Sequence, residues 1–87
     1  MQELKFKVLN ENGFHARPAA ELVGIVSKYH SAVTICKEGK KANLKSILGL
    51  LSLGIAKNDE VLIQTEGDDE IQALAAIENL GKKSELW

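Results

Sequence analysis

The sequence predicts an α+β fold of two layers, an open-faced sandwich in which a four-stranded antiparallel sheet carries three helices on one face. Apolar residues recur at every second position in some stretches, as in strands, and at every third or fourth position in others, as in helices. The two kinds of stretch follow each other in the order β-α-β-β-α-β-α. Strands that alternate apolar and polar residues form a sheet covered on one side only, and three amphipathic helices supply the cover.

The first half of the chain is expected to form a strand, a helix and a second strand. Residues 4–8 alternate apolar and polar side chains, as in a half-buried strand, and residues 10–13 carry turn chemistry. From Ala16 the apolar residues share one helical stripe. Pro18 fits the first turn of this helix, where a missing N–H has no consequence. Residues 32–37 alternate again and predict the second strand.

The middle of the chain predicts a short strand and a short helix. Residues 41–44 follow a tight connection and can pair back on the second strand. Ser46 is a plausible N-cap of the helix, and Gly54 is a plausible residue just beyond its C-terminus. Residues 60–65 alternate once more and predict the fourth strand.

The last helix is expected to begin with a capping box formed by Asp69 and Gln72. Gly81 and the two lysines after it suit the C-terminal end of this helix. We expect residues 84–87 to fray. The apolar face of the helix is expected to consist of Ile71, Leu74, Ile77 and Leu80.

Length and composition predict one small globular domain. The chain has 87 residues, of which 45% are hydrophobic and 26% are charged, so we treat residues 1–87 as a single domain with one core. The single cysteine, Cys36, cannot form an internal disulfide, which favours a cytoplasmic location. No apolar run approaches the roughly 20 residues of a membrane span, and the first residues lack a signal-peptide pattern.

The net charge of −1 is unevenly distributed along the chain. Residues 1–57 contain nine basic and four acidic residues, whereas residues 58–87 contain two basic and eight acidic residues. This asymmetry favours a partner that is recognised by complementary charge. A slightly acidic chain without an arginine-rich tract or an aromatic platform is not typical of nucleic-acid-binding proteins.

The candidate functional site lies in residues 13–20, Gly-Phe-His-Ala-Arg-Pro-Ala-Ala, at the predicted start of the first helix. A histidine just before a helix faces the positive end of the helix dipole and N–H groups that lack acceptors. A neutral imidazole nitrogen is a nucleophile, and the helix start, Ala16 to Pro18, can bind the oxygens of a phosphoryl group that His15 accepts. Arg17 adds a forked cation suited to phosphate. The motif contains no carboxylate or second histidine that could activate water, so we expect a carrier and not a hydrolase.

These residues carry a family resemblance. Residues 13–20 resemble the active-site signature of HPr, the histidine-containing phosphocarrier family of the bacterial phosphoenolpyruvate:sugar phosphotransferase system. Residues 43–54, Asn-Leu-Lys-Ser-Ile-Leu-Gly-Leu-Leu-Ser-Leu-Gly, are similar to the second signature of that family, which surrounds a regulatory serine. The spacing between His15 and Ser46 agrees with the family, and the resemblance spans essentially the whole chain, including the predicted order of elements.

The resemblance implies a role for each signature. His15 accepts a phosphoryl group on Nδ1 from phosphorylated enzyme I and passes it to the A domain of a sugar-specific enzyme II, while Arg17 stabilises the group in transfer. Ser46 resembles the serine that an ATP-dependent HPr kinase/phosphorylase modifies in low-GC Gram-positive bacteria. The modified form then serves as corepressor of a catabolite-control transcription factor. The implied protein is a cytoplasmic monomer that needs no cofactor or metal, binds no nucleic acid directly and does not insert into membranes.

Partner docking is expected around both signatures. A phosphate on Ser46 adds about two negative charges, which could repel an acidic partner from this surface. Phe14 stands where the family more often has Leu or Ile, and Leu48 and Leu51 replace methionines that are common in Gram-positive members. We expect only part of the cluster formed by Ile47, Leu48 and Leu51 to be exposed. The predicted docking residues are Phe14, Ala20, Lys45, Ile47, Leu48 and Leu51.

Three functions stay open on the sequence alone. The chain can be a phosphocarrier in sugar uptake, a regulatory module that acts mainly through phosphorylated Ser46 and a transcription factor, or a structural α+β domain or piece of a larger phosphotransferase. Because one variant of the family lacks the histidine and keeps only the serine role, the presence of His15 favours the carrier. The residues alone are less specific, since a serine at a helix start is most often only an N-cap. A nitrogen-regulatory variant also stays open, and the sugars served are not encoded in this chain.

Overall fold

The computed structural model describes residues 1–11, 13, 14 and 16–87. Within this part of the chain the elements follow the predicted order β-α-β-β-α-β-α, and the predicted fold class is confirmed. The elements are β1 (Gln2–Lys7), α1 (Ala16–Val26), β2 (Ala32–Lys37), β3 (Lys40–Asn43), α2 (Ile47–Ser52), β4 (Glu60–Glu66) and α3 (Glu70–Lys83).

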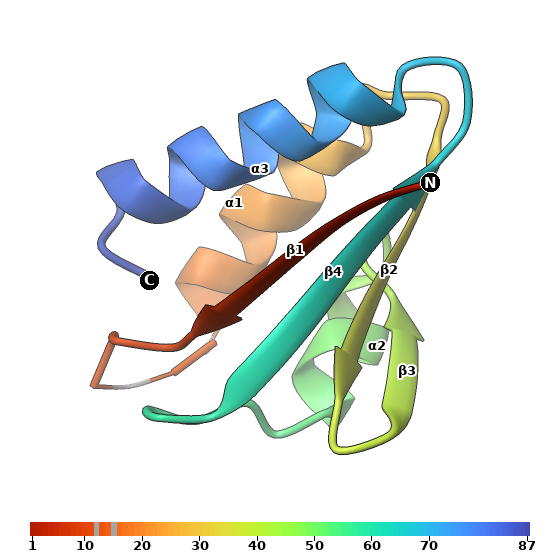
Figure 1. Ribbon diagram of the computed structural model, residues 1–87. Helices are drawn as coiled ribbons and strands as arrows, with labels where there is room; N and C mark the ends of the chain where they lie inside the picture. The colour runs from red at the N-terminus through yellow and green to blue at the C-terminus, as the bar shows by residue number, and fades with distance from the viewer. Residues whose placement is uncertain (12, 15) are drawn as a thin grey trace.

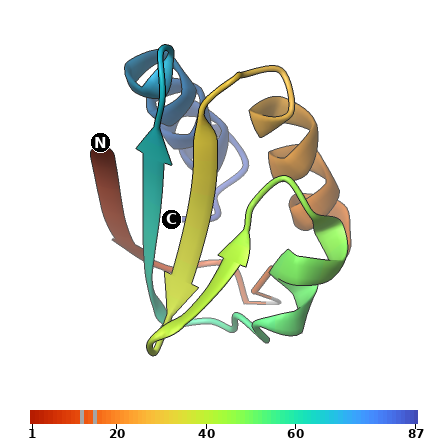
Figure 2. The same cartoon turned by 90° about the vertical axis from the view of Figure 1, so that its right-hand side faces the viewer.

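The strands of the described chain form one antiparallel sheet in the order β1-β4-β2-β3. β4 lies between β1 and β2, with Val61 opposite Phe6 and Ile63 opposite Ile35. Figure 1 shows α1 and α3 crossing the same face of this sheet, and Figure 2 shows α2 beside α1 next to β3. The three helices therefore form one layer, and the opposite face of the sheet is left open.

The core lies where the inward positions of the strands meet the apolar stripes of the helices. Val33 and Ile35 of β2 alternate with partly exposed residues and are at most 2% exposed, as alternation in a half-covered sheet requires. Val61 and Ile63 occupy the matching positions of β4. The helices contribute fully buried side chains to the same core, namely Leu22, Val26, Leu50 and Ile77.

Helix α3 buries most of the predicted apolar face, because Ile77 is buried and Leu74 and Leu80 pack against the core, but Ile71 does not belong to it. Its buried residues are Ala73, Ile77 and Gly81, which recur every four residues, whereas Ile71 is 65% exposed. Ile71 precedes Ala73 by two residues and therefore points away from the core stripe. Gly81, Lys82 and Lys83 lie at the C-terminal end of the helix, as predicted, and Ser84 is its C-cap.

The predicted capping box at the start of α3 is wrong. Asp69 occupies the N-cap position, but its side chain makes no capping hydrogen bond. Its carboxylate instead accepts hydrogen bonds from the backbone N–H groups of His30 and Ser31, both at 2.9 Å, and from the Ser31 hydroxyl. A carboxylate accepts several hydrogen bonds at once, so Asp69 joins the start of α3 to the turn before β2.

The predicted fraying of residues 84–87 is also wrong. Leu86 is 1% exposed, and its carbonyl oxygen accepts a hydrogen bond from the N–H of Leu9 at 2.9 Å. The N–H of Leu86 donates to Gly81 and that of Glu85 donates to Lys82, which together form a Schellman motif at the end of α3. The motif turns the chain back onto the core, with Glu85 in the left-handed region at φ 56°.

Candidate functional site

The loop that carries the first signature connects β1 to α1 and is fixed on the loop after α2. The N–H of Phe14 donates to the carbonyl oxygen of Ile55 at 3.2 Å, and that of Gly13 donates to Asn10 at 3.0 Å. Gly13 has φ 62°, and a Cβ at this position would overlap the Ile55 carbonyl oxygen, so only glycine fits. The predicted phosphoryl acceptor, His15, lies outside the described residues.

The start of α1 has the features of an anion-binding helix terminus. α1 begins at Ala16, the residue that follows His15 in the chain. Arg17 is exposed, and Pro18 is buried in the first turn, as predicted. The first turn contains no carboxylate. The positive end of the helix dipole is therefore not neutralised by an acidic side chain of this turn.

Ser46 is the N-cap of α2, as predicted. Its backbone is extended, with φ −113° and ψ 118°, and its hydroxyl oxygen accepts a hydrogen bond from the N–H of Gly49 at 3.0 Å. Gly54 follows the C-cap Leu53 with φ 62° and confirms the predicted end of the helix. The Ser46 side chain is only partly buried, so a modifying group has access to it from solvent.

An apolar surface on α2, formed by Ile47, Leu48 and Leu51, faces solvent. These side chains are 41%, 82% and 37% exposed. The expectation that only part of this cluster is exposed is corrected, because Leu50 and Leu53 supply the core contacts of the helix instead. Exposed leucines and isoleucines on one short helix are typical of a protein contact surface.

The other two docking candidates flank this surface differently. Ala20 is exposed on α1, which packs against α2. Lys45 is half-buried, and its ammonium group donates a hydrogen bond to the carbonyl oxygen of Tyr29 at 2.8 Å. Lys45 therefore joins the segment before α2 to the residues that follow α1.

The loop that supports Phe14 is held to β2 by Lys37. The ammonium group of Lys37 donates to the Gly54 carbonyl oxygen at 2.7 Å and lies 2.8 Å from the Asp59 carboxylate. Asp59 also accepts a hydrogen bond from the N–H of Ala56. The Lys37 contact, followed by that hydrogen bond, lowers the pKa of Asp59. Lys37 therefore holds the loop beneath the first signature at both ends, through the hydrogen bond to Gly54 and the ion pair with Asp59. Sequence periodicity could not reveal these contacts.

Phe14 does not fit the docking role predicted for it. Its side chain is 4% exposed and packs in an aromatic cluster with Phe6 and Trp87. The ring centroids of Phe6 and Trp87 are 3.9 Å apart. The side chain of Phe14 thus supports the signature loop from the core side and offers no surface to a partner. No local pattern predicts this cluster, because its members are far apart in the chain.

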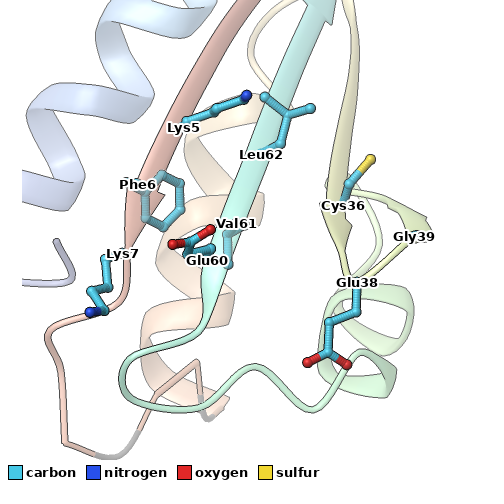
Figure 3. Close-up of a pocket in the computed structure, with 9 residues that line it drawn as sticks. All are labelled: Lys5, Phe6, Lys7, Cys36, Glu38, Gly39, Glu60, Val61 and Leu62. Atoms are coloured by element: carbon cyan, nitrogen blue, oxygen red, sulfur yellow. The ribbon is translucent and has the colours of Figure 1, made fainter.

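Figure 3 shows a hollow on the open face of the sheet, away from both signatures. Lys5, Leu62 and Cys36 lie side by side across β1, β4 and β2 in this hollow. Lysines and glutamates are interspersed along its rim. The helices, and with them the two signatures, lie on the other face.

The described residues give no sign of a metal centre or a membrane span. No group of three or more possible metal ligands is found among residues 1–11, 13, 14 and 16–87. No helix in this same part of the chain is long and apolar enough to cross a membrane.

Comparison with known proteins identifies the family. Residues 2–83 match the family described as the PTS HPr component phosphorylation site. The structure is similar to a histidine-containing phosphocarrier protein of Mycoplasma, at 34% identity over 98% of this chain and 97% of that chain, with a TM-score of 0.96. It is also similar to HPr-C-His of Thermoanaerobacter tengcongensis, at 41% identity over 95% and 93% of the two chains, with a TM-score of 0.91.

A third similar structure is that of Crh, the catabolite repression protein of Bacillus subtilis. It is 37% identical to this chain, covers 95% of both chains and has a TM-score of 0.75. That protein is described as a dimer with a swapped domain. The residues that match the family, 2–83, include both signatures and the elements that carry them.

Proposed function

This chain belongs to the HPr family, and on that premise we propose that it accepts a phosphoryl group on His15 from phosphorylated enzyme I and passes it to the A domain of a sugar-specific enzyme II. HPr proteins are phosphocarriers of the phosphotransferase system and not catalysts. The specific acceptor, the regulatory serine and the partners of this chain are the content of the proposal.

The observation that carries the proposal is the start of α1. His15 is followed directly by a helix whose first turn contains Arg17 and no carboxylate. In the forward step a lone pair of the neutral imidazole attacks phosphorus, and the N–P bond forms as the bond to the donor breaks, with its electron pair left on the donor. The second transfer reverses these roles with the acceptor. The guanidinium of Arg17 and the N–H groups of the helix start stabilise the phosphoryl oxygens in both steps.

We further propose that Ser46 is an ATP-dependent regulatory phosphorylation site. Its hydroxyl is accessible at an N-cap, and the α2 surface begins at the next residue, Ile47. A phosphate there adds about two negative charges beside the exposed apolar side chains. An acidic partner that docks on the α2 surface is then repelled, whereas a partner with arginines is attracted. Enzyme I and the enzyme II A domains are proposed as the first kind of partner, and HPr kinase/phosphorylase and a catabolite-control transcription factor recognise the serine.

The similarity to Crh favours a second candidate function, a module that acts mainly through phosphorylated Ser46. Incubation with enzyme I and labelled phosphoenolpyruvate separates the two. An acid-labile, base-stable label that disappears in His15→Ala supports the carrier. An acid-stable label that requires ATP, the kinase and Ser46, in a protein that takes no label from enzyme I, supports the regulator.

The working unit and its location are proposed on the same basis. We propose that residues 1–87 act as one domain and as a monomer in the cytoplasm, where the donor phosphoenolpyruvate is found. Dimers occur among the similar structures, so light scattering across a range of protein concentrations decides the oligomeric state. A stable dimer at working concentration contradicts the monomer.

A further inference from the structure

Trp87 lies at the centre of an aromatic cluster beneath the first signature. Its indole packs on Phe6 of β1 with ring centroids 3.9 Å apart and planes inclined by 30°. The ring of Phe14 lies 6.3 Å from the indole at 35°. Contacts between aromatic rings add to the stability that burial of their apolar area provides. The cluster therefore joins the signature loop, the first strand and the segment after α3.

Gly81 leaves the space that the indole of Trp87 occupies. This glycine is buried inside α3, where glycine is less favourable than alanine. A Cβ at Gly81 would overlap the six-membered ring of Trp87. The helix thus contains an unfavourable residue at the one place where the indole needs space, which indicates that the packing of Trp87 is a built feature of the fold.

The backbone around Trp87 is fixed from two sides. The Schellman motif ties Leu86 to Gly81 at 2.8 Å, and the carbonyl oxygen of Leu86 accepts a hydrogen bond from Leu9 at 2.9 Å. Leu9 lies in the connection that leads from β1 to the signature loop. The position of the indole is therefore set by α3 and by the beginning of the same loop whose end it contacts at Phe14.

We infer that Trp87 is a positioning residue for phosphoryl transfer, which holds Phe14 against the core and thereby fixes the backbone that leads into His15. Phe14 immediately precedes His15 in the chain, and its N–H is bonded to Ile55. With the side chain held by the indole and the N–H held by Ile55, Phe14 cannot shift without breaking one of the two contacts. The inference rests on the proposed role of His15 and adds a residue from the opposite end of the sequence to that site.

A matched pair of glycine substitutions tests the inference without removing an aromatic ring. Gly81→Ala displaces the indole, whereas Gly24→Ala in α1 adds a methyl group with nothing within 4 Å. Both changes raise helix propensity by the same amount. We expect the maximal rate of phosphorylation by enzyme I to fall about tenfold in Gly81→Ala, because small misplacements of reacting groups slow transfer strongly. The rate of Gly24→Ala is expected to stay at the wild-type value, and the KM for enzyme I to change little in either variant.

Substitution of Trp87 itself provides the rescue test. Trp87→Ala is expected to reproduce the rate loss of Gly81→Ala, and Trp87→Phe is expected to restore most of the rate. Phenylalanine keeps an aromatic ring against Phe6, and it removes an indole N–H that is buried without a hydrogen-bond partner in the described part of the chain. Urea unfolding confirms that each variant is folded under the assay conditions.

Hydrogen exchange at the Phe14 amide reports on the loop independently of phosphorylation. We expect this amide to exchange faster in Gly81→Ala than in the wild type, with no such change in Gly24→Ala, because loss of the indole contact frees the loop. Unchanged exchange in Gly81→Ala overturns the inference, and so does a wild-type rate of phosphorylation in folded Trp87→Ala. A wild-type protein that takes no label from enzyme I overturns the proposed function instead, and the exchange experiment then still decides whether Trp87 positions the loop.

Discussion

The hydroxyl of Ser31 donates a hydrogen bond of 2.5 Å to the carboxylate of Asp69, although 38 residues separate them. Ser31 is 1% exposed and stands just before β2, while Asp69 stands just before α3. Two backbone N–H groups, those of His30 and Ser31, donate to the same carboxylate. The pair therefore joins two elements of different layers at one end of the molecule.

This pair predicts acid sensitivity. The Ser31 hydroxyl, the His30 N–H and then the Ser31 N–H lower the pKa of Asp69 from its usual 3.8 to about 2. A carboxyl group with a lower pKa in the folded state stabilises the fold above its unfolded pKa, and this contribution is lost as the pH falls through the folded pKa. We therefore expect the urea midpoint to fall between about pH 4 and pH 2, and to fall less steeply over this range in Asp69→Asn. Equal slopes for the two proteins contradict the assignment.

A second prediction concerns the end of α3. Glu85 occupies the C′ position of the Schellman motif with φ 56°, a conformation that glycine adopts without steric strain. We expect Glu85→Gly to raise the free energy of unfolding by up to about 1 kcal/mol, because relief of left-handed strain outweighs the greater freedom of glycine in the unfolded chain. Thermal unfolding measures the change. The control is Glu66→Gly in β4, where glycine is expected to destabilise.

Two substitutions of Ser46 separate its structural role from its proposed regulatory role. Ser46→Ala removes the N-cap and is expected to lower the free energy of unfolding by about 1 kcal/mol, with wild-type phosphorylation by enzyme I. Ser46→Asp keeps a capping oxygen and adds a charge, so its stability should remain near that of the wild type while phosphorylation slows. Urea unfolding and initial labelling rates measure the two effects. If Ser46→Asp is labelled as fast as the wild type, the proposed regulation by charge is wrong.

Truncation of two leucines of α2, Leu48 and Leu50, is expected to have opposite effects on stability and on binding. Leu48 is 82% exposed and Leu50 is fully buried. Leu50→Ala should lower the free energy of unfolding by about 2–5 kcal/mol because it opens a cavity in the core. Leu48→Ala should leave stability within about 0.5 kcal/mol and weaken binding to enzyme I, measured by titration calorimetry. Unchanged affinity in Leu48→Ala removes this residue from the docking surface.

Local signals in the sequence predicted the elements and the caps of α2 well. The alternation of residues 32–37 matches β2 residue for residue, and the serine and glycine signals bound α2 as expected. These features depend on the backbone preferences of a few adjacent residues, so they can be inferred from a short window. The family resemblance supplied the roles of His15, Arg17 and Ser46, which remain predictions.

Contacts between distant segments could not be predicted in the same way. Asp69 lies in a residue pattern typical of a capping box, but its carboxylate accepts hydrogen bonds from His30 and Ser31 and does not cap the helix. Trp87 has no local pattern at all, because its partners Phe6 and Phe14 lie more than 70 positions away. Periodicity describes which face of an element is apolar, but it does not say which distant side chain covers that face.

The central position of β4 has a consequence for the order in which the fold can form. β2 and β3 are joined by a short turn and can pair as soon as they have been synthesised, whereas β1 pairs only with β4 in the described sheet. Residues 8–59 lie between β1 and β4, and pairing across such a distance is slow because loop closure precedes any gain in contacts. During synthesis on the ribosome, β1 therefore has no strand to pair with until β4 has been synthesised. A register slip of one residue in β4 would then expose Val61 and Ile63 and misalign both neighbouring strands in a single event.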